Sequence, residues 1–162
     1  MTGRKLSDGE HIIRYVPFSK LRRDEDDNVI GVLGAAFKMR PVDDYLSVTS
    51  LEYFAGRRQE QVVSAVHAIR ASDLEVKSKG GFAIGNVGRI CEVCSTCAGR
   101  YKLRVLHEPE NDNKAHVAVR RFPKEDDELF ELLASDAWSE VVKNSDVEAG
   151  VRAAPDDPAW EV

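Results

Sequence analysis

The sequence predicts an α+β fold, a single domain with a mainly antiparallel sheet and two or three helices packed on one face. Short apolar segments with strand-like patterns occur in both halves of the chain. Two longer segments instead repeat apolar residues at helical spacing. Their order, strands, helices, strands and a last helix, is typical of α+β proteins. We expect the domain to span residues 11–143, with a flexible leader at 1–10 and an acidic flexible tail at 144–162.

Three strand-like segments occupy the first part of the chain. In residues 11–16, HIIRYV, alternate side chains would share a face of the sheet, and Pro17 ends the pattern. Residues 29–39 are apolar but interrupted by glycines, which favours a strand or a bulged strand over a helix. Residues 45–48, YLSV, form the next predicted strand.

Residues 37–54 change from strand-like to helix-like patterning and hold many large apolar side chains, so we expect them to form the centre of the core. Thr49 and Glu52 have the spacing of a capping box, in which a hydroxyl and a carboxylate bind free backbone N–H groups at a helix start. This spacing predicts a short helix at 50–55. A longer helix is predicted at 57–71, where apolar residues recur at helical spacing.

The second half of the chain predicts more strands and one helix. Residues 82–90 and 101–106 are predicted strands, and we expect the cysteines between them to lie in a long hairpin loop. Residues 115–119, AHVAV, form another predicted strand. The last predicted helix, 123–143, has acidic residues in its first turn, where the helix dipole favours them.

Composition narrows the class of protein. A chain of 162 residues with 43% hydrophobic and 31% charged residues suits one soluble globular domain. No apolar run reaches the roughly 18 residues that a membrane-spanning helix needs, and the N-terminus has no signal-peptide pattern. We therefore expect a cytoplasmic protein with no membrane partner. Residues 121–162 hold 12 acidic and 4 basic side chains, which disfavours nucleic acid and favours a basic protein partner.

The closest approach to a known motif is the cysteine group Cys91, Cys94 and Cys97. C-x-x-C spacing lets the thiolates of a tight turn bind one metal ion, and structural zinc takes four ligands. His107 would be the fourth ligand, with His116 as the other choice. A tyrosine occupies the position where a ferredoxin-type run needs a cysteine, which disfavours an iron–sulfur cluster. The alternatives to zinc are three unliganded thiols or thiol redox chemistry.

A second group of polar residues lies near the predicted centre of the core. It consists of His11, Arg14, Tyr15, Ser47, Ser50 and Glu52. His11 and Glu52 would act as general base and acid, and Arg14 would bind a phosphate or carboxylate with two hydrogen bonds. The alternative is structural, with Glu52 in the capping box, Ser47 on a strand face and Arg14 in a surface ion pair.

Three hypotheses of function follow. The first is a cytoplasmic accessory or protein-interaction module with a structural zinc ion in the 91–97 loop. The second is a small enzyme that acts on a nucleotide-like or other anionic substrate through His11, Arg14 and Glu52. The third is a thiol-based redox or metal sensor. The sequence leaves open whether the protein is an enzyme.

Overall fold

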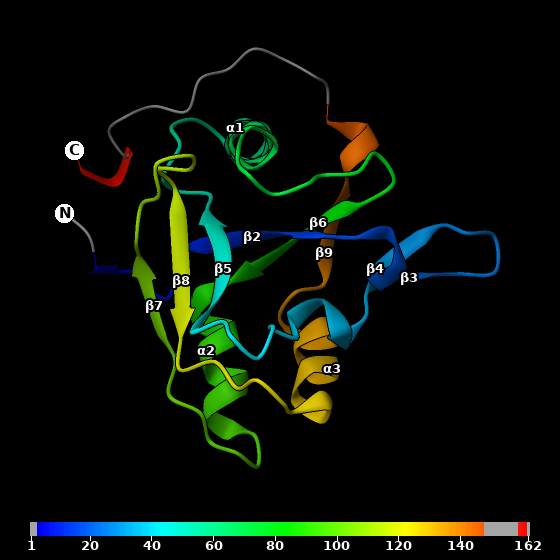
Figure 1. Ribbon diagram of the computed structural model, residues 1–162, viewed down its shortest axis with the longest axis vertical. Helices are drawn as coiled ribbons and strands as arrows, with labels where there is room; N and C mark the ends of the chain where they lie inside the picture. Colours follow the sequence, from blue (N-terminus) through cyan, green and yellow to red (C-terminus); the bar gives the residue numbers. More distant parts are fainter. Residues whose placement is uncertain (1–2, 148–158, 162) are drawn as a thin grey trace.

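An antiparallel sheet of seven strands forms the centre of the computed structural model, which describes residues 3–147 and 159–161. In spatial order the strands are β1 (Arg4–Lys5), β7 (Arg104–His107), β8 (His116–Arg120), β5 (Tyr45–Ser50), β2 (His11–Val16), β6 (Gly81–Asn86) and β9 (Glu140–Lys143). A separate hairpin consists of β3 (Leu21–Arg23) and β4 (Val29–Val32), and projects to one side (Figure 1). All strand pairs are antiparallel, so the predicted α+β class with a mainly antiparallel sheet is confirmed.

The three α-helices within the described residues cover both faces of the sheet rather than one. Figure 1 shows α1 (Arg58–Ala71) on one side and α2 (Val87–Thr96) and α3 (Asp127–Asp136) on the other. The reason is that the central strands are apolar on both faces. Neighbouring residues Ile12 and Ile13 of β2 are both fully buried, but they belong to two separate core clusters. The expectation of helices on a single face is therefore corrected, because each apolar face needs its own cover.

The expected leader is part of the domain over residues 3–10. Strand β1 pairs with β7, and Leu6 is buried in the core. Glu10 is also buried, and its carboxylate accepts hydrogen bonds from the backbone and the hydroxyl of Ser7. Residues 3–10 thus supply an edge strand and a core side chain, which corrects the expected boundary at residue 11.

The chain beyond β9 returns to the domain in two described pieces. A 3-10 helix at Asn144–Asp146 is followed by the buried Val147. A second 3-10 helix, Ala159–Glu161, places Trp160 against Tyr53, with ring centroids 5.5 Å apart. Residues 148–158 and 162, which make up most of the expected acidic tail, lie outside the described residues.

The predicted core segment 37–54 is central, but its local structure differs from the prediction. Phe37, Tyr53 and Phe54 are among the largest fully buried side chains. Strand β5 continues through Thr49 to Ser50, and a turn follows in place of the predicted helix at 50–55. The Ser50 hydroxyl accepts the N–H of Tyr53 in that turn. The predicted capping box is therefore wrong.

Cys91 and Cys94 lie on a helix and Cys97 is its C-cap residue, so the cysteines are not in the predicted hairpin loop. Helix α2 begins after Asn86, whose side chain accepts a hydrogen bond from the Arg89 backbone at 2.9 Å. This is N-capping by a preferred residue type, and it replaces the second half of the predicted 82–90 strand. Strands β6 and β7, on either side of α2, are not neighbours in the sheet. None of the helices in the described ranges is long and apolar enough to span a membrane.

Candidate functional site

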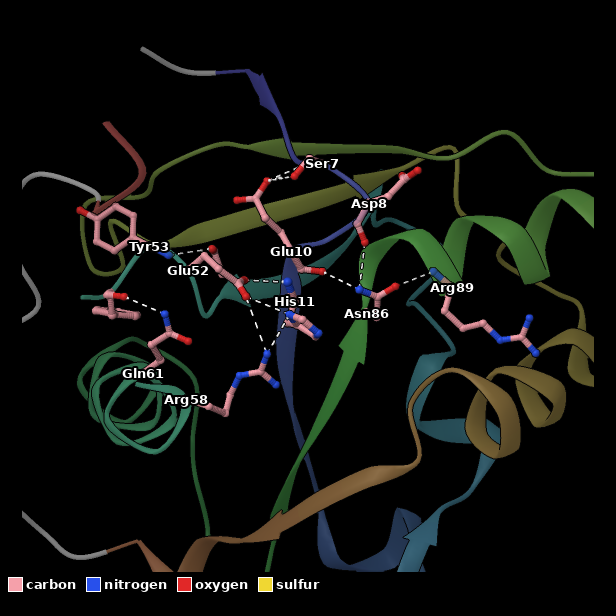
Figure 2. A network of polar contacts seen from close by, with 12 residues as sticks. Ser7, Asp8, Glu10, His11, Glu52, Tyr53, Arg58, Gln61, Asn86 and Arg89 are labelled. Atoms are coloured by element: carbon pink, nitrogen blue, oxygen red, sulfur yellow. Dashed lines mark hydrogen bonds and ion pairs between the residues drawn. The ribbon is translucent and has the colours of Figure 1, made fainter. Parts of the chain in front are cut away.

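The first candidate site is a hydrogen-bonded group around His11 (Figure 2). The His11 backbone N–H donates to Glu52 Oε1 at 2.7 Å, and His11 Nδ1 lies 2.8 Å from Glu52 Oε2. Glu52 comes from the turn after β5, and His11 begins β2, which pairs with β5 at this end. His11 and Glu52 thus lie together, as the sequence hypothesis requires.

The cation beside this pair is Arg58 and not Arg14. Arg58 Nη2 lies 2.9 Å from His11 Nδ1 and 3.8 Å from Glu52 Oε2. One ring nitrogen cannot donate to Glu52 and accept from Arg58 at once, so the proton on Nδ1 decides which contact is a hydrogen bond. All three side chains are between a quarter and two-fifths exposed, which places the group at the surface.

Arg14 lies between two diverging strands. Strands β2 and β5 pair only at Ile12 and Ile13, whereas β2 pairs with β6 over its whole length. Beyond that point the Arg14 side chain crosses the opening. Its Nη1 donates to the Ser47 carbonyl oxygen at 2.7 Å, and its Nε donates to the Ala36 carbonyl oxygen at 3.0 Å. The predicted surface ion pair is absent, since no carboxylate in the described part of the chain lies within 4 Å of this guanidinium.

Arg14 lines an open cleft of about 970 Å³. The floor consists of residues of β2, β5 and β8, with Ser47 and His116 among them. The sides come from the segment after α1 and from the loop between β7 and β8. The volume is at the upper end of the range of sites that hold small molecules.

Ser47 and His116 form a hydrogen-bonded pair on this floor. Ser47 Oγ lies 2.7 Å from His116 Nε2, and His116 Nδ1 lies 2.8 Å from the Glu108 carbonyl oxygen. A carbonyl oxygen can only accept, so the neutral imidazole carries its proton on Nδ1. Nε2 then accepts the Ser47 hydroxyl proton. Ser47 is exposed, whereas His116 is 3% exposed. The hydroxyl of Ser47 thus faces the cleft, and the imidazole that it contacts is buried and fixed in position.

The residues around His116 hold it in place. Arg120 binds both carboxylate oxygens of Glu108 at 2.6 Å, and these hydrogen bonds lower the pKa of Glu108. Glu108 is therefore anchored at the position where its carbonyl meets the imidazole. The Tyr45 ring packs edge-on against His116, with centroids 5.6 Å apart. Glu110 Oε1 lies 3.8 Å from Nε2, close enough to stabilise a proton there.

Burial changes the pKa of Arg14. Removal from water lowers the pKa of Arg14 to about 10, an effect that Asp43 partly offsets. The guanidinium is still charged at neutral pH, and the two carbonyl groups that it binds are uncharged. A half-buried cation with N–H groups left for a ligand in a cleft favours an anionic ligand.

The cysteines on α2 and at its C-cap occupy different environments. Cys94 is fully buried in the core, whereas Cys91 and Cys97 are partly exposed. Burial is the main reason that the pKa of Cys94 rises to about 12, with smaller contributions from the neighbouring thiols. A metal ligand must be a thiolate, and this environment disfavours one. Within residues 3–147 and 159–161, no three Cys, His, Asp or Glu side chains are grouped so as to hold a metal ion.

His107, the predicted fourth zinc ligand, packs among aromatic rings. Its ring centroid lies 5.8 Å from Tyr53 and 5.1 Å from Trp160. Its Nε2 lies 2.8 Å from the Lys114 carbonyl oxygen. These contacts give His107 a structural role, and the geometry gives the zinc hypothesis no support.

The sequence did not pair Ser47 with His116. In the sheet Thr49 lies opposite His116, and Ser47 lies opposite Ala118, so Ser47 and His116 are diagonal neighbours on one face. Such neighbours are within reach of long or aromatic side chains. The available signal was a polar residue at an alternate position in each of two apolar strands. Ser47 of β5 and His116 of β8 are about seventy residues apart in the sequence, so the pairing of these strands could not be predicted from local patterns.

Comparisons with protein-family models, with curated proteins and with solved structures find no significant match to this chain.

Proposed function

We propose that the protein is a small hydrolase that cleaves an ester or amide in a substrate with an anionic group. Ser47 is the nucleophile, His116 is the general base, and Arg14 binds the anion. The observation that carries the proposal is the 2.7 Å contact between Ser47 Oγ and His116 Nε2, on the floor of a cleft that Arg14 also lines. An activated serine of this kind needs an adjacent base that is itself oriented by a third group.

The proposed reaction uses the pair in two half-reactions. Ser47 Oγ attacks the carbonyl carbon while its proton passes to His116 Nε2, and the protonated ring then gives that proton to the leaving group as its bond to carbon breaks. Water attacks the acyl-serine in the same way and restores the hydroxyl. The Glu108 carbonyl holds Nδ1–H throughout, and Glu110, 3.8 Å from Nε2, stabilises the protonated ring.

Arg14 supports the choice of an anionic substrate. Its guanidinium uses two donors on the carbonyl oxygens of Ser47 and Ala36, which fixes its position, and other N–H groups remain for a ligand. A carboxylate or phosphate bound there would lie beside Ser47, because Arg14 already contacts that residue. This keeps Arg14 and the anionic substrate of the enzyme hypothesis, but it assigns the acid–base chemistry to His116.

The His11 and Glu52 pair is the weaker basis for catalysis. It lies at the surface, where Arg58 competes for the same ring nitrogen. The accessory-module and thiol-sensor hypotheses gain no comparable support, since Cys94 is buried and its thiolate disfavoured.

A fluorophosphonate probe followed by peptide mass spectrometry tests the proposal. We expect the probe to label Ser47, and Ser47→Ala to abolish the labelling. His116→Gln should slow it by about 100-fold or more, because general-base catalysis contributes at least this much. Ser95→Ala is the matched control, since Ser95 is an exposed serine on α2. A thermal melt of each variant shows that it is folded. Unlabelled Ser47 in folded wild-type protein would refute the proposal.

A further inference from the structure

The cleft around Ser47 is lined by side chains of opposite charge. The basic residues that line it are Arg14, Lys20 and Arg40. The acidic residues that line it are Asp73, Glu75, Glu110 and Asp112. Such a cleft differs from a plain anion site, because only part of its lining attracts negative charge.

The two sets of charges come from separate segments. Arg14 is joined to the segment of Ala36, which precedes Arg40, by its hydrogen bond to the Ala36 carbonyl. On the acidic side, the Asp73 backbone N–H donates to Asp112 Oδ2 at 2.8 Å and joins the segment after α1 to the β7–β8 loop. Both the basic and the acidic residues line the same cleft.

Ser47 is connected by contacts to both sets of charges. Its carbonyl oxygen accepts from Arg14 at 2.7 Å, whereas its hydroxyl pairs with His116. His116 Nε2 in turn lies 3.8 Å from Glu110 Oε1. A substrate carbonyl at the Ser47 hydroxyl would thus have a cationic group on one side of it and a carboxylate on the other.

We propose that the substrate is a dipeptide-like zwitterion, with its carboxylate on Arg14 and its ammonium group on the acidic side near Glu110. This inference rests on the proposed hydrolase function. In a dipeptide the scissile carbonyl lies between the ammonium and carboxylate groups, which matches the order of the groups around Ser47. A dipeptide is small enough for the cleft, whose volume of about 970 Å³ lies in the range of small-molecule sites. Hydrolysis consumes one water and releases two amino acids, and His116 delivers the proton that the departing amine needs.

Binding to the Ser47→Ala variant tests the substrate class without turnover. Isothermal titration would compare Ala-Ala with N-acetyl-Ala-Ala, which lacks the ammonium group, and with Ala-Ala-amide, which lacks the carboxylate. We expect each blocked peptide to bind at least about tenfold more weakly, because each loses a charge-assisted contact. Blocked peptides that bind within about twofold of Ala-Ala, or Ala-Ala that fails to bind, would overturn the inference.

A second substitution assigns the ammonium contact. In Ser47→Ala/Glu110→Gln, acetylation of the peptide should weaken binding by less than about threefold. Glu25→Gln in place of Glu110→Gln is the charge-matched control, because Glu25 is an exposed acid of the β3–β4 hairpin and does not line the cleft. An unchanged effect of acetylation in the Glu110 variant would refute this assignment.

The two proposals can fail separately. Loss of the zwitterion preference with intact probe labelling of Ser47 would leave the hydrolase function and remove the dipeptide. A clear zwitterion preference without labelling would leave the ligand class and remove the serine chemistry.

Discussion

Both carboxylate oxygens of Glu52 contact the same residue, His11, one through the backbone N–H at 2.7 Å and the other through Nδ1 at 2.8 Å. The two residues are 41 positions apart in the chain. Their contact joins the start of β2 to the turn after β5. At the other end of the shared strands, Arg14 joins β2 to β5 through the Ser47 carbonyl. Polar side chains thus join both ends of this strand pair, whose backbones pair over only a short stretch.

Glu52→Ala should destabilise the fold by about 1–3 kcal/mol, because it leaves the His11 N–H without its acceptor. Glu52→Gln should cost less, since the amide oxygen can still accept that hydrogen bond. Urea unfolding measures both values. Glu25→Ala should change the stability by no more than about 0.5 kcal/mol, because Glu25 is exposed. A Glu52→Ala variant as stable as Glu25→Ala would show that the contact is dispensable.

The sequence predicted elements with local patterns well. The strand at 11–16 and the helix at 57–71 agree with β2 and α1 to within one residue, because alternation and helical spacing are properties of the segment itself. Helix α2 was missed because its cysteines suggested a metal loop and its neighbouring glycines suggested a strand. The Asn86 cap was the signal for its start. The partners of Ser47 and His11 depend on the order of strands, which no local pattern contains.

Tertiary packing explains why position 85 is a glycine. A Cβ added at Gly85 would lie 2.8 Å from Ile90 Cδ1 and 2.9 Å from Trp138 Cδ2, both in the core. Gly85→Ala should therefore destabilise the protein by about 1–3 kcal/mol through overpacking. Gly31→Ala in β4 is the control, because no atom lies within 4 Å of its added Cβ. Differential scanning calorimetry compares the two. Equal melting temperatures for the two variants would contradict the packing at Gly85.

The Glu108–Arg120 ion pair predicts a dependence of stability on pH. Hydrogen bonds from Arg120 lower the pKa of Glu108 below its ordinary 4.5, so the folded state holds this proton less tightly than the unfolded chain. The stabilisation is present above pH 4.5 and is lost as the pH falls through the lower folded-state pKa.

Arg120→Gln should thus lower the free energy of unfolding at pH 7 by about 0.2–1 kcal/mol, the range for partly exposed pairs. Its difference from wild type should shrink at about pH 3, because below pH 4.5 the unfolded chain takes up the Glu108 proton before the folded protein does. Urea unfolding at both pH values measures this. Lys102→Gln removes an exposed charge in the same region and should show no such shrinkage. A difference for Arg120→Gln that is the same at both pH values would count against the ion pair.

Cys94 predicts a loss of stability in alkali. Its pKa is raised from 9.0 to about 12, mainly by burial, so the unfolded chain releases the thiol proton at a lower pH than the folded protein. The contribution to stability is complete below pH 9 and is lost as the pH rises toward 12. Between pH 9 and pH 10 the loss from this one group is about 1 kcal/mol.

Cys94→Ala should remove this alkaline loss, although it also leaves a small cavity that lowers stability at every pH. The readout is therefore the slope of unfolding free energy against pH and not its absolute value. Ser95→Ala is the control, because it changes an exposed side chain without a thiol on the same helix. Iodoacetamide with mass spectrometry gives an independent check, in which Cys91 and Cys97 react in the folded protein and Cys94 reacts only after unfolding. Early alkylation of Cys94, or a slope that its removal does not change, would place this thiol outside the core.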